Sequence, residues 1–336
     1  MAKILVTGGL GFIGSHTVVE LQNKGFDVVI IDDLSNTTID VLDNITAITG
    51  IKPEFAQVDL RIKNDVKAFF DEYSVDGIIH FAAFKAVGES MHKPLDYYEN
   101  NLGSLVYILQ EMRDRNLDNF IFSSSCTVYG QADELPITEK APVKAAESVY
   151  GNTKQIGEEI IKDASTAHGL NTIALRYFNP VGAHPSIKIG ELPLGVPQNL
   201  IPFITQTAAG MRAELSVFGD DYDTVDGTAV RDYIHVVDLA KAHIAALQRL
   251  INGNNKEKFE YFNVGTGKGS SVLEIIKAFE KVNELKLNYK IVERRAGDIT
   301  AAFADTTIAN KELNWKTELS LEDALSSAWK WQQAQK

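Results

Sequence analysis

The sequence VYGNTK, residues 149 to 154, contains the two side chains best suited to acid–base chemistry, Tyr150 and Lys154. A spacing of four residues places both on one face of a helix, where an ammonium group can act on a phenol. A free tyrosine has a pKa of about 10, too high for an efficient base near neutral pH. A neighbouring cation lowers such a pKa by about 1 to 3 units, into the range of general acid–base catalysis. The same spacing also occurs on solvated helix surfaces, so its meaning depends on the surrounding fold.

An apolar run upstream, NFIF, leads into three serines at residues 123 to 125. We expect a strand whose carboxyl end carries these serines, at the edge where open α/β sheets bind ligands. Ser125 is therefore a candidate to hydrogen-bond and orient a substrate hydroxyl. Ser123 and Ser124 are interpreted as residues that only end the strand.

A glycine-rich segment, VTGGLGFIGSH, joins the first predicted strand to the first predicted helix. Gly8, Gly11 and Gly14 recur every three residues, which lets a backbone turn approach a pyrophosphate at a helix N-terminus. Asp32 ends the second predicted strand 18 residues after Gly14, about the position of a carboxylate that binds an adenosine ribose. Because this carboxylate would repel a 2′-phosphate, the sequence favours NAD over NADP. An oxidised nicotinamide would also place a second positive charge near Tyr150.

The first 180 residues alternate short apolar runs with segments of helical spacing. Strands are predicted at 3–8, 27–32, 53–59, 76–83, 119–125 and 171–178, and helices at 12–24, 62–73, 95–116 and 148–168. The apolar runs lack the alternation of half-exposed strands, so we expect a parallel sheet covered on both faces. The predicted fold class is therefore α/β, with a doubly wound parallel sheet of Rossmann type.

After FNP at 178–180 the sequence changes to a passage rich in proline and glycine. We predict a NAD-binding domain over 1–179 and a smaller C-terminal α/β substrate domain over 180–336. A helical segment near 232–250 is expected to pack back on the first domain. A final helix is predicted at 320–334, with Ser320 as its N-cap.

Composition and charge exclude several classes of function. The formal net charge of −12 argues against broad binding of nucleic acid or anionic membranes, which needs a basic surface. No apolar run approaches the roughly 20 residues of a membrane span. The opening MAKILVTGG lacks the apolar stretch of a signal peptide. We therefore predict a cytoplasmic location. The only cysteine, Cys126, excludes an intrachain disulfide and a cysteine-rich metal site, and we interpret it as a buried small residue.

Several motifs together resemble the extended short-chain dehydrogenase/reductase family, and within it the UDP-glucose 4-epimerases. The resemblance extends nearly end to end and rests on TGGLGFIGSH, the Ser125/Tyr150/Lys154 set, HFAAFKAVGES, RYFNPVGAHP, VRDYIHV and RRAGD. It implies tightly bound NAD, a homodimer, and interconversion of UDP-galactose and UDP-glucose in galactose metabolism. By the family's mechanism, Tyr150 removes the proton of the sugar 4-hydroxyl while hydride passes from C4 to NAD. The 4-keto sugar then rotates, and hydride returns to its other face.

The resemblance also assigns residues to the two ligands. For NAD it implies Gly8, Gly11, Phe12, Ile13, Gly14, Asp32, Asp33, Leu34, Ser35, Asn36, Thr37, Asp59, Leu60, Phe81, Ala82, Ala83, Lys85, Asn100, Ser125, Tyr150, Lys154 and Phe178. For the UDP-sugar it implies Ser125, Tyr150, Asn179, Asn199, Leu200, Ser216, Phe218, Arg231, Arg295, Asp298 and Ala302. Arginine suits the second role because its planar fork donates paired hydrogen bonds to phosphate. Without the motif, Arg231 would be interpreted as forming a surface ion pair with a nearby aspartate.

Two positions depart from the family pattern. Ala83 stands where a glycine is common, which adds one methyl group beside the cofactor strand. Ala302 stands where stricter relatives carry a tyrosine and where relatives that accept N-acetylated sugars carry a small residue. The sequence therefore predicts that UDP-N-acetylhexosamines are also accepted.

Two alternative functions share these motifs. A nucleotide-sugar 4,6-dehydratase has the same fold and tyrosine, but that family carries Asp-Glu after its active serine or threonine, where this chain has Cys126 and Thr127. A non-catalytic NAD-binding redox regulator would have no need of a tuned base, so Tyr150 and Lys154 argue against it.

Overall fold

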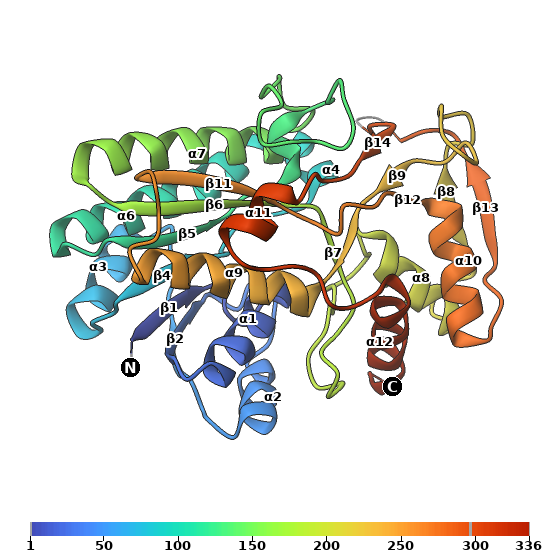
Figure 1. Cartoon of the computed structure of the whole chain (residues 1–336). Helices are drawn as coiled ribbons and strands as arrows, with labels where there is room; N and C mark the ends of the chain where they lie inside the picture. Colours follow the sequence, from blue (N-terminus) through green and yellow to red (C-terminus); the bar gives the residue numbers. More distant parts are fainter. Residues whose placement is uncertain (1, 296–297, 336) are drawn as a thin grey trace.

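The computed structural model describes residues 2–295 and 298–335 (Figure 1). Within them the main sheet has seven strands in the order β11-β6-β5-β4-β1-β2-β3, and all neighbouring pairs are parallel. These strands are β1 (Lys3–Thr7), β2 (Asp27–Asp32), β3 (Glu54–Gln57), β4 (Gly77–His80), β5 (Asn119–Ser123), β6 (Asn171–Tyr177) and β11 (Phe259–Val264). The predicted doubly wound parallel sheet is confirmed.

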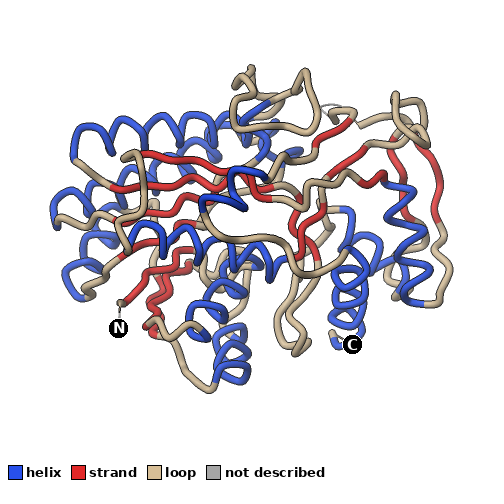
Figure 2. Tube along the Cα trace, in the orientation of Figure 1, coloured by secondary structure: helices blue, strands red, loops and turns tan. Residues whose placement is uncertain are grey.

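Helices cover both faces of this sheet (Figures 1 and 2). One face carries α1 (Phe12–Asn23), α2 (Asp40–Thr49) and α9 (Val236–Ile251), and the other carries α3 (Lys63–Glu72), α6 (Ser104–Arg115) and α7 (Val149–His168). Successive residues of β1 enter opposite cores, Ile4 and Val6 on one side and Leu5 on the other. Since side chains alternate along a strand, burial of both faces explains the uninterrupted apolar runs.

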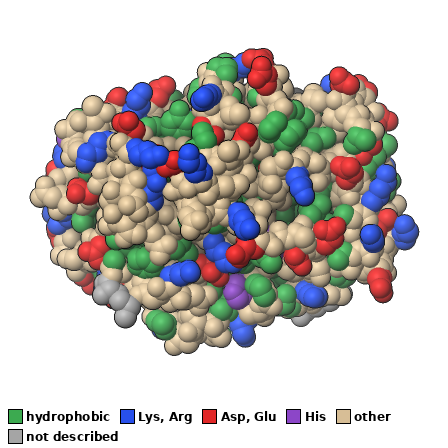
Figure 3. All heavy atoms as spheres, in the orientation of Figure 1, with side chains coloured by type: hydrophobic (Ala, Val, Ile, Leu, Met, Phe, Trp, Pro, Cys, Tyr) green, Lys and Arg blue, Asp and Glu red, His purple; other side chains and the backbone are tan. Residues whose placement is uncertain are grey.

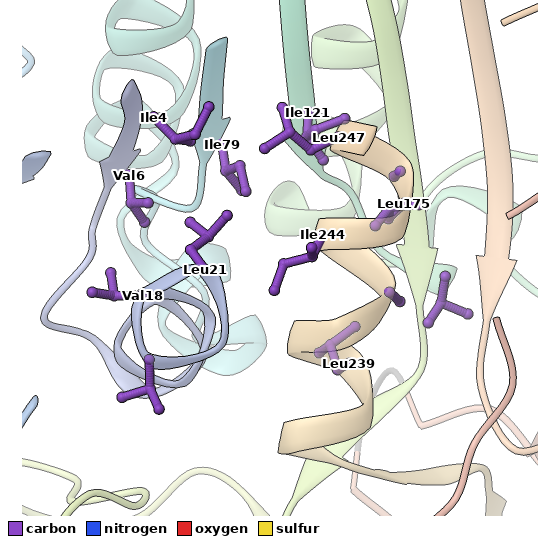
Figure 4. Close-up of a cluster of buried hydrophobic side chains, with 14 of the residues drawn as sticks. Ile4, Val6, Val18, Leu21, Ile79, Ile121, Leu175, Leu239, Ile244 and Leu247 are labelled. Atoms are coloured by element: carbon purple, nitrogen blue, oxygen red, sulfur yellow. The ribbon is translucent and has the colours of Figure 1, made fainter. Parts of the chain in front are cut away.

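Two elements of this body come from the second half of the chain. Helix α9 lies beside α1 and against β5 and β6, and its Leu239, Ile244 and Leu247 share a core with Val18 and Leu21 (Figure 4). Strand β11 extends the sheet by pairing with β6. The segment predicted near 232–250 overlaps α9, whereas β11 was not predicted. We propose that residues 236–264 be grouped with the NAD-binding domain.

The remaining part surrounds a smaller core of its own. Its strands are β7 (Asn179–Val181) paired with β10 (Tyr233–His235), β8 (Leu215–Phe218) paired with β13 (Tyr289–Val292), and β9 (Val230–Arg231) between β12 (Ser270–Ser271) and β14 (Ala301–Ala302). Its helices are α8 (Leu200–Ala208), α10 (Val272–Asn283) and α12 (Leu321–Ala334), while α11 (Thr307–Glu312) lies against β11. The N-cap of α12 is Ser320, as predicted: its hydroxyl accepts from the Asp323 N–H at 3.1 Å.

One predicted helix, 95–116, is interrupted. The chain forms α5 (Pro94–Tyr98), a π-helical turn (Glu99–Gly103) and then α6. Inside the turn the side chain of Asn101 accepts from the Phe84 N–H at 2.8 Å and donates to the Phe84 carbonyl and the Thr153 hydroxyl, both at 3.0 Å. Apolar spacing cannot show such an insertion, which is frequent at functional sites. Two further short elements, α4 (Val87–His92) and a 3₁₀ turn (Cys126–Tyr129), were also not predicted.

The surface is mixed in charge. On the face shown in Figure 3, acidic and basic side chains are interspersed and hydrophobic ones form scattered groups. Among the helices of the described residues, none has the length and apolarity needed to cross a bilayer.

Candidate active site

The segments predicted to bind the ligands lie near the point where the strand order reverses, between β1 and β4. The glycine loop follows β1, residues 81–85 follow β4, and the serines follow β5. Thr7 and His80, at the ends of β1 and β4, are joined by a 2.8 Å hydrogen bond, and the Ala82 N–H donates to the Thr7 hydroxyl at 3.3 Å. Ligands of doubly wound sheets bind beyond the carboxyl ends of the strands at this reversal.

The glycine loop has the shape of a diphosphate cradle. Gly8 has φ +66°, a Cβ on it would lie 2.9 Å from the Ala82 nitrogen, and a Cβ on Gly14 would overlap the Gly8 carbonyl oxygen. Helix α1 starts with the Ser15 N–H bonded to Gly11 O at 2.9 Å, which leaves the N–H groups of Phe12 and Ile13 without partners inside the helix. Within the described part of the chain no side chain caps α1, and no acidic residue lies in its first turn. These residues fit an anion at the helix N-terminus.

The Asp32 carboxylate is fixed beside this cradle. It is buried, and its two oxygens accept from the Leu10 N–H at 3.1 Å and the Leu34 N–H at 3.0 Å. Burial raises the pKa of Asp32, while the two backbone hydrogen bonds oppose that rise. Each carboxylate oxygen keeps a second lone pair, so the group fits a ribose hydroxyl.

Helix α7 places Tyr150 and Lys154. Its N-cap, Ser148, accepts from the Gly151 N–H at 3.0 Å, and the Tyr150 N–H donates to the Ser90 hydroxyl of α4 at 3.1 Å. The Lys154 ammonium lies 5.9 Å from the centroid of the Tyr150 ring and donates to the Ser123 carbonyl at 2.6 Å. Both side chains are buried. The predicted pair is therefore on one face of a helix and does not form part of a solvated surface.

The electrostatics of this pair differ from the expectation of an acidic phenol. Burial raises the pKa of Tyr150 above its ordinary value, Tyr177 raises it further, and the Ser125 hydroxyl lowers it. Burial also lowers the pKa of Lys154 to about 8, against the opposing charge of Glu158. Within the chain alone, removal from water outweighs the neighbouring ammonium. The predicted lowering of the phenol pKa thus depends on the second positive charge, that of the cofactor.

The three serines have separate partners. Ser125 is buried, and its hydroxyl accepts from the Thr127 N–H at 3.2 Å. Ser123 shares a 2.8 Å hydrogen bond with the Tyr177 hydroxyl, and Ser124 donates to Glu158 Oε1 at 2.5 Å. Ser123 and Ser124 were interpreted as residues that only end a strand. They do lie at the end of β5, and their hydrogen bonds also join it to β6 and α7.

Several residues assigned to the UDP-sugar lie together in the smaller part. Arg295 donates to Asp298 Oδ1 at 2.7 Å, Arg231 lies 3.8 Å from the same oxygen, and the Arg295 guanidinium lies 5.7 Å from the centroid of the Phe218 ring. Two guanidinium groups thus share one carboxylate, which leaves net positive charge for an anion. Ser216 is two residues before Phe218 on β8, on the same face of that strand. Ala296 and Gly297 of the RRAGD motif lie outside the described residues.

Ala302 lies beside both Arg231 and the segment that follows the three serines. It pairs with Arg231 in the register of β14 and β9 and is 2% exposed. It belongs to a buried cluster with Phe178 and Val128, against which Cys126 packs. Burial raises the pKa of the Cys126 thiol to about 11. A neutral thiol at this position is unsuited to acid–base chemistry near pH 7.

Other assigned residues are engaged within the chain. The Asp59 carboxylate pairs with Arg61 at 2.7 Å, and the amide groups of Asn100 and Asn199 donate to Asn101 and Glu191 at 3.0 and 2.7 Å. Glu191 also lies 3.4 Å from the Lys85 ammonium. No hydrogen bond among residues 2–295 and 298–335 joins Asn199 to Arg231 or to Asn179.

Sequence reasoning missed Asn101 and Glu158. Asn101 holds Phe84, in the loop after β4, to Thr153 of α7. Glu158 follows Lys154 by four residues, so the spacing that selected Tyr150 and Lys154 could have selected it too.

Comparison with known proteins gives the relationship directly. The model of the NAD dependent epimerase/dehydratase family matches residues 4–265. The chain belongs to this family. It is 49% identical to the UDP-glucose 4-epimerase of Haemophilus influenzae over 330 residues, which cover 98% of this chain and 97% of that protein. Its fold matches UDP-glucose 4-epimerase of Stenotrophomonas maltophila, with bound NAD and formylated UDP-arabinopyranose, with a TM-score of 0.96, 47% identity, and coverage of 100% and 99% of the two chains.

Another solved 4-epimerase structure is similar to this chain over its whole length. The UDP-Glc/GlcNAc 4-epimerase of Campylobacter jejuni has a TM-score of 0.85 and 35% identity to this chain. The match covers 99% of this chain and 100% of that one.

Proposed function

We propose that this protein interconverts UDP-galactose and UDP-glucose by redox-neutral epimerisation at C4, with tightly bound NAD. The observation that carries the proposal is the meeting of Tyr150, Lys154 and Ser125 at the reversal of a doubly wound sheet. It is supported by near-complete alignment with UDP-glucose 4-epimerases. The glycine cradle and Asp32 fit the pyrophosphate and a ribose of NAD, and the carboxylate of Asp32 disfavours NADP.

Each residue of the site has a defined task in this reaction. Ser125 hydrogen-bonds and orients the sugar 4-hydroxyl, and Tyr150 accepts its proton and later returns it. Lys154 contributes positive charge beside the phenol and holds the Ser123 carbonyl. NAD, when bound, supplies the acceptor and then the donor of the C4 hydride. Arg231 and Arg295 bind the UDP phosphates, so that the sugar alone needs to rotate between the two transfers.

Direct turnover tests the proposal. The purified protein, without added dinucleotide, is incubated with UDP-galactose, and the products are followed by proton NMR, while the bound dinucleotide is identified by mass spectrometry. UDP-glucose and bound NAD are expected. A 4-keto-6-deoxy sugar would instead identify a dehydratase, which the neutral Cys126 thiol disfavours. Bound NAD without turnover would favour a redox regulator.

Ala302 leads to a prediction about specificity. Ala302 is buried beside Arg231, and a methyl group there takes up less of the site than a tyrosine would, so UDP-N-acetylglucosamine should also be epimerised. Ala302→Tyr should lower kcat/KM for that sugar about tenfold more than for UDP-galactose, because only the 2-acetamido sugar needs the space that the ring would fill, and a methylene-sized misfit is worth about 1–3 kcal/mol. Ala301→Tyr, on the opposite face of the same strand, is the control. If the unaltered protein converts UDP-galactose but not UDP-N-acetylglucosamine, the prediction is wrong.

We also propose that the protein is a homodimer, as the family resemblance implies, and that it is located in the cytoplasm. Light scattering after size exclusion should give twice the 37.0 kDa of one chain. A mass of one chain at micromolar concentration would exclude the dimer.

A further inference from the structure

Glu158 lies one helical turn beyond Lys154, and no step of the reaction uses it. Its side chain is 8% exposed, and it is ion-paired with Arg176, whose side chain is 6% exposed. A buried ion pair is weak evidence for stability, since well-packed apolar residues often serve as well. The partners of Glu158 suggest another role, which rests on the function proposed above.

Two side chains of α7 hold the end of β5. Lys154 donates to the Ser123 carbonyl at 2.6 Å, and Glu158 accepts from the Ser124 hydroxyl at 2.5 Å. These contacts fix the two residues that precede Ser125. Tyr150, Lys154 and Glu158 follow one another at intervals of four and therefore share one face of α7. The same helix face thus carries the base and fixes the backbone that presents Ser125.

Glu158 is itself held in one orientation. Arg176 donates from Nε to Oε1 at 2.9 Å and from Nη2 to Oε2 at 2.5 Å, a two-pronged contact of fixed geometry. Its Nη1 donates to the Tyr129 hydroxyl at 3.0 Å, which donates to Asn263 Oδ1 at 2.7 Å. The guanidinium lies 4.0 Å from the centroid of the Tyr261 ring.

Glu158 lies one helical turn from Lys154 in a buried setting, and the Arg176 guanidinium is paired with the same carboxylate. The other titratable groups around the ammonium are Tyr150 on its own helix, His80 on β4 and Tyr177 on β6, which hydrogen-bonds Ser123. Burial lowers the pKa of His80 to about 3, so that ring is neutral, and burial raises the pKa of both tyrosines, so without the charge of the cofactor they are neutral as well. Glu158 is the acidic group that opposes the effect of burial on Lys154.

We propose that Glu158 is a positioning residue of this active site: it fixes Ser124, and so Ser125, relative to Tyr150, and it places a negative charge one helical turn from Lys154. Arg176 orients Glu158 for both tasks. Glu158 therefore has a geometric effect and an electrostatic effect, and a different variant tests each of them.

Glu158→Gln tests the electrostatic effect. In protein labelled with ¹³C-lysine, the Lys154 ε-carbon signal is assigned by its loss in Lys154→Met, and its titration is followed by NMR. Removing the opposite charge one helical turn away should move the titration midpoint down by about one pH unit. The alkaline limb of the kcat profile should move in the same direction, with kcat at pH 8 about fivefold lower and KM changed less than threefold. Glu159→Gln, an exposed neighbour on α7, should change neither.

Ser124→Ala tests the geometric effect, because it removes the hydroxyl and leaves the carboxylate in place. It should lower kcat several-fold with the Lys154 titration unchanged. Glu158→Gln combined with Arg176→Gln removes both buried charges and keeps the measurement possible if the single variant does not fold. This double variant should show a smaller downward movement of the Lys154 midpoint than Glu158→Gln, because it also removes the positive charge of Arg176.

An unmoved Lys154 midpoint in the Glu158 variants, or full kcat in Ser124→Ala, would overturn the proposal. The NMR titration needs no substrate. It therefore distinguishes failure of this inference from failure of the proposed function, which would appear as absence of turnover in the unaltered protein.

Discussion

Tyr150→Phe should lower the turnover of UDP-galactose about 10³-fold and leave the amount of bound NAD unchanged, since a positioned acid–base group contributes roughly 10² to 10⁴ in rate. The substitution removes one hydroxyl from a buried ring and leaves α7 and its cap intact. Turnover is measured by NMR and bound NAD by its absorbance after denaturation. Because phenylalanine has no ionisable group, the loss should remain at alkaline pH.

A matched control isolates the effect of the hydroxyl. Tyr107→Phe makes the same change on α6, where the tyrosine lies beneath the Lys63 ammonium, and it should keep full turnover. A loss of less than tenfold in Tyr150→Phe would show that another group takes the proton.

Gly14→Ala should have the next largest effect, a loss of most bound NAD together with lower thermal stability. The added methyl group would overlap the Gly8 carbonyl oxygen and would also lie 2.8 Å from the Gly9 Cα, so the loop must move away from α1. A displaced loop can no longer present the free N–H groups of Phe12 and Ile13 to a pyrophosphate. Bound dinucleotide and the melting temperature are measured on the protein as purified.

Gly88→Ala is the matched control, because it adds the same methyl group on α4 where no atom lies within 4 Å. It should retain bound NAD and the original melting temperature. Retention of NAD in Gly14→Ala would mean that the cradle does not hold the cofactor.

The elements that could be predicted from the sequence are those whose own residues show which side chains are buried. Strands β1 and β2 are apolar along their length because both of their faces are covered, and α7 has a serine cap and a regular apolar spacing. The glycine loop was recognisable because it lies between such a strand and a helix. Strand β11 was missed because its place in the sheet depends on pairing with β6, far away in the sequence.

The sequence indicated candidate residues for the site, but it did not indicate the direction in which the fold shifts the pKa of the phenol. Spacing identified Tyr150 and Lys154, but the pKa of the phenol depends on how much water the fold removes, which spacing cannot report. Likewise, Arg231 and Arg295 could be selected for phosphate, but their sharing of Asp298 depends on two segments meeting in space. The partners of Ser124 lie on α7 and could be found only in the folded chain.

Turnover of UDP-galactose deuterated at C4 tests the redox-neutral mechanism most directly. The reaction is run in ordinary water without added dinucleotide, and the product is analysed by NMR. The mechanism predicts UDP-glucose that keeps deuterium at C4, because the same hydrogen leaves and returns within one site. Replacement of that deuterium by solvent hydrogen, or a requirement for added NAD in each turnover, would contradict it.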